Sequence, residues 1–243
     1  MPRPTQAFID LSALAHNLAV VRQYVPRSRI MAVVKADAYG HGLLHTASAL
    51  KDVDGFALLE LDAAISLRDA GYQQPILLLE GFFSTEELAL FEQYRLSADI
   101  HHSEQIAMLS DSKHHNLDLF LKINTGMNRL GLASEQFPQI MKALTDHPGI
   151  DSITLMTHFA SADDPLEEEE VFQQLQYFET ITQNHKYPHS LANSAAIIRY
   201  PVTHADWVRP GIMLYGASPF ADKTASELNL KPVMTLSSKI IAI

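Results

Sequence analysis

The chain has 243 residues, of which 47% are hydrophobic, and a formal net charge of -10 at pH 7. This composition excludes a disordered chain, and its acidic balance disfavours nucleic acid or an anionic membrane as a partner. The absence of cysteine excludes disulfides, thiolate zinc sites and cysteine nucleophiles, and the lack of a secretory signal or an apolar span indicates a cytoplasmic protein that acts on a small molecule.

Eight short apolar runs, rich in branched residues, alternate along the chain with longer segments of helical periodicity. This alternation is typical of βα units, and eight of them predict a (β/α)8 barrel of the TIM type. The predicted strands are residues 30–36, 55–60, 75–80, 96–100, 117–124, 152–159, 189–194 and 206–211. The clearest helices expected between them are residues 61–71, 85–94, 133–144 and 166–184.

Two further segments do not fit the barrel count. Residues 6–11 have the pattern of a strand and precede a helix expected over 12–25, and residues 231–243 alternate like a strand. We therefore expect a barrel over residues 11–230, and strands of a C-terminal β-domain within 1–10 and 231–243. Because the sequence stops within that last run without a turn or a polar tail, we expect a truncated chain.

The stretch VVKADAYGHG (33–42) places a lysine at the end of the first predicted barrel strand. In such barrels the C-terminal ends of the strands carry the catalytic groups. A desolvated lysine there can condense with a carbonyl, whereas a lysine that reaches water remains a solvated ammonium. Lys35 is therefore a candidate Schiff-base residue, with the Tyr39 hydroxyl and the permissive backbone of Gly40 and Gly42 close by.

A second polar stretch follows the last two predicted strands, where barrels typically bind phosphate. Ser194 is expected to cap a short helix, with Asn193 before it, and Gly211 beside Ile212 lets the backbone approach an anion. Each pattern alone also occurs in ordinary turns. A Schiff-base lysine and a phosphate cradle at one barrel mouth together predict a site for pyridoxal 5′-phosphate (PLP).

These stretches resemble the alanine racemases, and especially the small biosynthetic and catabolic forms of Gram-negative bacteria. The similar segments span nearly the whole chain and are AVVKADAYGHG (32–42), LKINTGMNRLG (121–131), MTHFASAD (156–163), ANSAA (192–196) and DWVRPGIMLYGASP (206–219). The resemblance implies PLP as the cofactor, L- and D-alanine as substrates, and a role in peptidoglycan precursor supply or alanine catabolism. It also implies that Lys35 forms the internal aldimine and then moves a proton on one face of the Cα carbanion.

The resemblance also implies roles for other cavity residues. Arg209 matches an arginine that faces the pyridine nitrogen, which a guanidinium cannot protonate, so that the carbanion is less delocalised and transamination is suppressed. His158 matches a partner of the second catalytic group. The residues that match the phosphate cradle and its surroundings are Tyr39, Asn193, Ser194, Gly211 and Ile212.

Two basic residues come from the LKINTGMNRLG segment. Arg129 matches an arginine that binds the phenolic oxygen of the cofactor and lies near the substrate carboxylate. Lys122 matches a lysine that is carbamylated in many members of the family, which would give an anion able to orient Arg129. An unmodified Lys122 is the simpler alternative.

Racemisation by this chemistry needs two proton-transfer groups on opposite faces of a planar intermediate. The resemblance implies that the second group is a tyrosine in the C-terminal domain of the other subunit of a head-to-tail homodimer. We therefore expect the present chain to be inactive or weakly active alone. No metal site is expected, because the adjacent histidines at 101–102 and 114–115 do not share a helix face.

Three alternatives stay open. A non-enzymatic PLP-binding barrel protein would need no strand beyond residue 230, but its motifs differ from KADAYGHG. A Schiff-base aldolase would bind a sugar phosphate without a coenzyme, and its signature is absent. A racemase for another small amino acid is the third, because one methylene in a pocket is worth only about 1–3 kcal/mol.

Overall fold

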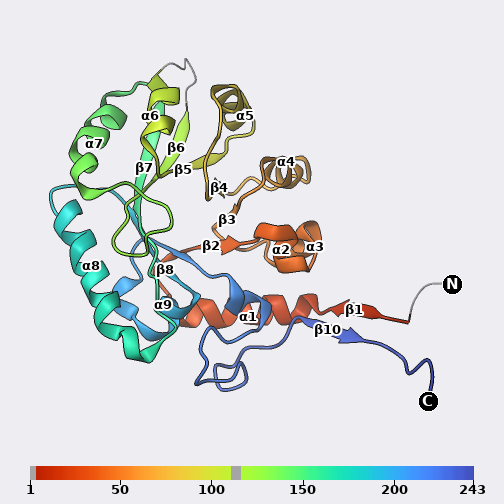
Figure 1. Cartoon of the computed structure of the whole chain (residues 1–243). Coiled ribbons are helices and arrows are strands. Elements are labelled where there is room, and N and C mark those ends of the chain that lie inside the picture. Colours follow the sequence, from red (N-terminus) through yellow and green to blue (C-terminus); the bar gives the residue numbers. More distant parts are fainter. Residues whose placement is uncertain (1–3, 111–115) are drawn as a thin grey trace.

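The computed structural model describes residues 4–110 and 116–243. Eight parallel strands close into a barrel, in which each strand pairs with the next and β9 pairs back with β2 (Figure 1). The barrel strands are β2 (Arg29–Val33), β3 (Gly55–Leu58), β4 (Ile76–Leu78), β5 (Ser97–Ile100), β6 (Leu117–Lys122), β7 (Ile150–Met156), β8 (His189–Asn193) and β9 (Trp207–Arg209). All eight predicted strands are present, and the (β/α)8 barrel is confirmed.

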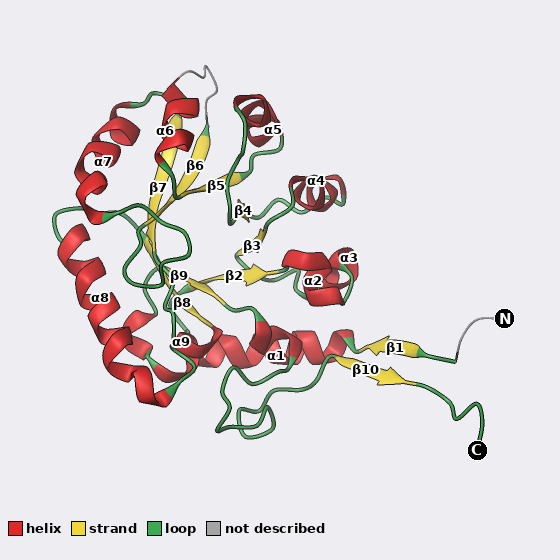
Figure 2. Ribbon diagram, in the orientation of Figure 1, coloured by secondary structure: helices red, strands yellow, loops and turns green. Residues whose placement is uncertain are grey.

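Helices surround the barrel on its outside (Figure 2). They are α1 (Leu11–Tyr24), α3 (Leu43–Ala49), α4 (Leu61–Asp69), α5 (Leu88–Gln93), α6 (Ser103–Ser110), α7 (Phe137–Asp146), α8 (Glu168–Thr182) and α9 (Ser194–Arg199), while α2 (Lys35–Gly40) has an unusual winding described below. The helices expected over 85–94 and 133–144 each begin with a 3-10 turn, at Thr85–Glu87 and Ser134–Gln136.

Helix α1 shows how local sequence sets the start of an element. The Asp10 side chain accepts hydrogen bonds from the backbone N–H groups of Ser12 and Ala13, at 2.9 and 3.1 Å. These two donors would otherwise lack a partner in the first turn. The helix then buries an apolar stripe that includes Leu14 and Leu18.

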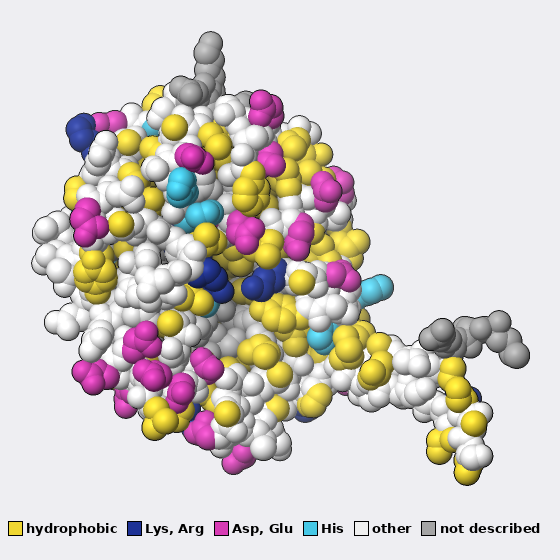
Figure 3. All heavy atoms as spheres, viewed as in Figure 1, with side chains coloured by type: hydrophobic (Ala, Val, Ile, Leu, Met, Phe, Trp, Pro, Cys, Tyr) yellow, Lys and Arg dark blue, Asp and Glu magenta, His cyan; other side chains and the backbone are white. Residues whose placement is uncertain are grey.

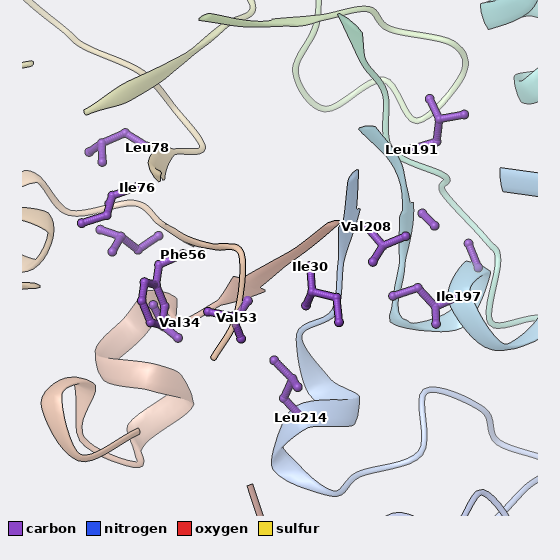
Figure 4. Close-up of a cluster of buried hydrophobic side chains, with 14 of the residues drawn as sticks. Ile30, Val34, Val53, Phe56, Ile76, Leu78, Leu191, Ile197, Val208 and Leu214 are labelled. Atoms are coloured by element: carbon purple, nitrogen blue, oxygen red, sulfur yellow. The ribbon is translucent and has the colours of Figure 1, made fainter. Parts of the chain in front are cut away.

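Two apolar layers hold the barrel together. Side chains that point inward form a small cluster of Met31, Val33, Ala57, Leu77, Phe120, Met156 and Trp207. Side chains that point outward pack against the helices in a much larger cluster, part of which Figure 4 shows, with Ile30 on β2 and Val208 on β9 near Leu214. This division follows from the alternation of side chains along each strand.

A two-stranded sheet lies outside the barrel. Strand β1 (Gln6–Ile9) pairs antiparallel with β10 (Met234–Ser237), and both extend away from the barrel in Figure 1. Both outer segments therefore contain a strand, but the strand expected throughout 231–243 is confirmed only over β10, because β1 offers four partner residues. Phe8 and Leu236 on this sheet are 67% and 71% exposed.

No helix in the described part of the chain is long and apolar enough to cross a membrane.

Candidate active site

The charged residues of the site continue the inward-facing columns of the barrel. Phe120 and Trp207 point into the barrel, so Lys122 and Arg209, each two residues further along its strand, face the same way. Lys35 and His158 follow Val33 and Met156 at the same spacing, just beyond the ends of β2 and β7. The apolar interior is therefore covered at the C-terminal mouth by the nitrogen-bearing side chains of Lys35, Lys122, His158 and Arg209.

These side chains line a cavity of about 580 Å³ at the barrel mouth. The structure brings together in its wall all ten residues singled out in the sequence, which are Lys35, Tyr39, Lys122, Arg129, His158, Asn193, Ser194, Arg209, Gly211 and Ile212. Figure 3 shows lysine and arginine side chains in a hollow at the centre of this face, with acidic side chains around it. A locally cationic cavity on an acidic protein suits an anionic ligand.

The segment after Lys35 winds in a left-handed sense. Ala36, Asp37, Ala38 and Tyr39 all have φ between 50 and 55°, a conformation that costs L-residues about 1–2 kcal/mol each. Asp37 stabilises it, since its carbonyl accepts from Gly42 N at 3.0 Å and its Oδ1 accepts from Leu43 N at 2.7 Å. Backbone strain of this kind is typical of functional sites.

Two aromatic residues support this turn. The Tyr215 ring lies against that of Tyr39, with centroids 4.6 Å apart, and its buried hydroxyl donates to the Val33 carbonyl at 3.0 Å. Burial raises the pKa of Tyr215 above its ordinary value, so the hydroxyl remains a donor. Tyr215 was not predicted as a site residue, because nothing in its local sequence pattern distinguishes it from a core tyrosine.

The predicted phosphate cradle is formed by the segments after β8 and β9. Asn193, and not Ser194 as expected, caps α9: the Asn193 side chain accepts from Ala196 N at 3.0 Å. Ser194 is instead buried as the first helical residue, and its Oγ accepts from Gly211 N at 2.9 Å. The expectation was wrong by one residue because Asn193 has the extended backbone that a cap requires.

Arg209 is fixed by an unusually complete set of partners. Its Nη1 donates to the Ser190 carbonyl at 2.7 Å and to the Ser190 hydroxyl at 2.6 Å. Its Nη2 donates to the Thr157 carbonyl at 2.6 Å, the Leu191 carbonyl at 3.2 Å and His158 Nδ1 at 3.2 Å. Burial lowers the pKa of Arg209 to about 10, so that it remains a cation at neutral pH.

Carboxylates near the cavity were missed by the sequence analysis. Glu80 and Asp163 line its wall, and Asp99 lies buried next to Lys122, with Lys122 Nζ 3.5 Å from Asp99 Oδ2. No group of three or more metal-binding side chains occurs within residues 4–110 and 116–243. His114 and His115, considered above for a metal site, lie outside the described residues.

Comparison with known proteins gives the family. Residues 9–219 match the family model described as alanine racemase, N-terminal domain. The chain belongs to the alanine racemase family. It is 58% identical over 244 residues to the alanine racemase of Nitrosospira multiformis and 61% identical over 246 residues to that of Nitrosomonas europaea. Both alignments cover 100% of this chain and 68% of the relative.

A solved structure agrees with the sequence comparisons. The alanine racemase from Acinetobacter baumannii has a TM-score of 0.92 and 41% identity to this chain, over 99% of this chain and 72% of that one. Both the barrel and its sequence motifs are therefore those of the family, whose cofactor is PLP.

The residues present fit PLP. A Cβ placed on Gly211 would lie 2.6 Å from the Tyr39 hydroxyl, so the backbone there must stay bare for the tyrosine to reach the cradle. The same cavity wall contains the Lys35 amine and several cations that suit the phosphate and phenolate charges. A lysine amine for the aldehyde and an arginine for the pyridine nitrogen, both in this cavity wall, are groups that PLP sites use.

Substituting Gly211 by alanine is expected to weaken PLP binding by about 10-fold to 100-fold, because the new methyl group displaces the Tyr39 hydroxyl and removes one hydrogen bond to a charged group. Equilibrium titration of PLP by visible absorbance measures this. Tyr39→Phe is the matched control, since it removes the hydroxyl without a clash. The two losses should not add in the double variant, and full additivity would show that the methyl acts elsewhere.

His158 predicts a pH dependence of stability. Burial and the neighbouring cations Arg209 and Arg129 lower its pKa well below the ordinary value of 6.5. Below about pH 6.5 the unfolded chain therefore binds a proton that the folded chain rejects, and the free energy of unfolding falls as the pH falls. In His158→Asn this slope should be shallower, by up to about 1.4 kcal/mol per pH unit.

Urea unfolding at a series of pH values measures the slope, with His45→Asn, at an exposed position, as the control. Equal slopes for the wild type and His158→Asn would contradict a neutral His158.

Proposed function

We propose that the protein is a PLP-dependent racemase that interconverts L- and D-alanine, with Lys35 as one of its two acid–base groups. The observation that carries this proposal is the position of Lys35 at the barrel mouth, facing one cavity together with the cradle at Gly211. When bound, PLP supplies an aldehyde that condenses with amines and a ring that withdraws the electron pair of the α carbon.

The residues that line the cavity then have distinct physical tasks. Tyr39, Ser194 and the backbone at Gly211 and Ile212 hold the phosphate, and Asn193 fixes the start of the helix beside it. Lys35 would hold PLP through its amine and, when that amine is free, would take a proton from the α carbon of the substrate and return it. Arg129, which is exposed in the cavity wall, binds the phenolic oxygen and the substrate carboxylate.

Arg209 limits the reaction to racemisation. Its N–H groups are occupied by backbone carbonyls and by Ser190, so the guanidinium stays in place as a cation that does not give up a proton. A pyridine nitrogen held against Arg209 would receive no proton from it, and this would disfavour proton return at the wrong carbon. His158 accepts from Arg209 and presents its other ring nitrogen to the second catalytic group.

The proposal is tested by exchange of the alanine α-hydrogen. The PLP-loaded protein in deuterium oxide is expected to replace the α-hydrogen of one enantiomer of alanine with deuterium, and NMR follows this directly for L- and D-alanine in separate samples. Exchange needs only one acid–base group, so it tests Lys35 independently of the second group. Binding of PLP without exchange would favour a non-enzymatic PLP-binding protein, and a Schiff base with a sugar phosphate alone would favour an aldolase. Faster exchange of serine would indicate another amino acid.

We also propose that the second acid–base group is a tyrosine of a C-terminal domain, contributed across a head-to-tail homodimer in the cytoplasm. The sheet of β1 and β10 supports a further domain, because it leaves the barrel and exposes Phe8 and Leu236. Residues 11–230 would then form the PLP-binding domain. Sedimentation of the protein together with its C-terminal domain should give a dimer, and a fully active monomer would contradict this arrangement.

A further inference from the structure

The carboxylate of Asp99 is unusual among the side chains below the cavity. It is fully buried, and no other aspartate or glutamate within residues 4–110 and 116–243 is buried. Neither of its oxygens has a hydrogen-bond partner in the described structure. A buried carboxylate without hydrogen bonds is costly unless a cation compensates it.

The strand register brings that cation next to it. Asp99 on β5 pairs with Phe120 on β6, whose side chain points into the barrel, and Lys122 follows two residues later on the same face. Lys122 Nζ lies 3.5 Å from Asp99 Oδ2, and the Lys122 side chain is only 9% exposed. The pair thus lies inside the barrel, with Lys122 in the cavity wall and Asp99 buried behind it.

The other titratable groups around Asp99 do not replace Lys122 as its nearest cation. Arg209 on β9 attracts the carboxylate, and Glu80 beyond β4 opposes its charge. His101 Nδ1 lies 3.9 Å from Asp99 Oδ1, but burial lowers the pKa of His101 to about 4, so His101 is neutral. Burial raises the pKa of Asp99 itself to about 7, against the attraction of Lys122 and Arg209, so the carboxylate is ionised in mildly alkaline solution.

Lys122 needs such an anion to stay charged. Burial lowers its pKa, the nearby Arg209 and Arg129 lower it further, and Asp99 acts in the opposite direction. Without Asp99 the amine would lose its proton readily, and a neutral buried amine is the form that reacts with carbon dioxide. In that reaction the nitrogen lone pair forms an N–C bond, one C=O π bond opens to a carboxylate, and a proton leaves to solvent.

We propose that Asp99 is the built-in counter-ion of Lys122 and that it keeps this lysine an unmodified ammonium, so that Asp99 takes the place of a lysine carbamate below the cavity. Asp99 is a positioning residue, because it acts on the site through Lys122. Unlike a carbamate, the Asp99 carboxylate supplies a negative charge next to Lys122 that does not depend on dissolved carbon dioxide. Of the two states of Lys122 that the sequence left open, the ion pair therefore selects the unmodified one.

The test measures the carbamate itself. The protein is equilibrated with ¹³C-bicarbonate well above the pKa of Asp99, and the carbonyl region is observed by ¹³C NMR. The wild type should give no carbamate signal that Lys122→Gln removes, since carbamates on exposed amines are common to all variants. Asp99→Asn should give one, because the lysine loses its counter-ion, and the signal should vanish in the double variant with Lys122→Gln. Asp118→Asn, an exposed carboxylate on β6, is the matched control and should behave as the wild type.

Two outcomes would overturn the proposal. The first is a carbamate signal in the wild type that Lys122→Gln removes, and the second is no signal in either the wild type or Asp99→Asn. Circular dichroism checks that each variant folds, and Asp99→Leu is a second neutral variant for this apolar site. A wild-type signal that Lys122→Gln removes overturns the proposal even if neither Asp99 variant folds. Since PLP takes no part in the readout, its result is independent of the proposed function.

Discussion

Replacing Lys35 by alanine is expected to abolish the attachment of PLP that survives borohydride reduction. Lys35 is the amine that lies at the end of β2 and faces the cavity together with the Gly211 cradle. Without that amine the PLP aldehyde has no positioned group with which to condense. Exchange of the alanine α-hydrogen should fall by at least about 10²-fold to 10⁴-fold, the contribution of a positioned acid–base group.

Peptide mapping after reduction identifies the modified residue, and visible absorbance follows its formation. Lys51→Ala removes an exposed lysine and serves as the control. In the wild type the label should map to Lys35 alone. A label of equal yield in Lys35→Ala, or one that maps to Lys122 in the wild type, would contradict the assignment. In either case PLP would still be bound, so the result would contradict the role of Lys35 and not the identity of the cofactor.

Replacing Arg209 by leucine should destabilise the fold by about 3–5 kcal/mol. The guanidinium is buried and donates to three backbone carbonyls, which are those of Thr157, Ser190 and Leu191. Leucine fills part of the volume but leaves all three carbonyls without their donor. The carbonyls lie at the ends of β7 and in β8, so their loss also loosens the strands on which His158 and Asn193 are placed.

Urea unfolding followed by circular dichroism measures this loss. Arg27→Leu, at an exposed position, is the matched control and should change stability by less than about 0.5 kcal/mol. Arg209→Lys should recover little, because a lysine cannot place donors in the fork geometry of a guanidinium. A loss no larger than that of Arg27→Leu would mean that water replaces the missing donors.

The barrel was predictable because its signal is repeated. Each strand is a short apolar run at a regular spacing, and eight such runs specify the fold even where a single boundary is shifted by a few residues. Lys35 was predictable for a related reason, since a charged residue at the end of an apolar run falls at the mouth of the barrel.

Other features depend on contacts that no local pattern reveals. ADAY (36–39) contains two alanines, which favour a right-handed helix, yet the chain turns left-handed there. Asp37 holds the turn by accepting hydrogen bonds from Gly42 and Leu43, and the Tyr215 ring packs against Tyr39 from a distant segment. Asp99 looks like an ordinary polar residue in a short strand. Its importance comes from the register with β6, which sets Lys122 beside it. Pairing between strands, rather than propensity, thus decides the parts of the site that were missed.

The seam between β2 and β9 has a consequence for the order of folding. Its register pairs are Arg29 with Trp207 and Ile30 with Val208, which join the two ends of the barrel sequence. Contacts between such distant residues form slowly, and during synthesis β2 must wait with an open edge until β9 has emerged. Lys35 follows one side of this seam and Gly211 follows the other. Affinity for the cofactor should therefore arise only when the barrel closes, and the appearance of bound PLP during refolding would time that last step.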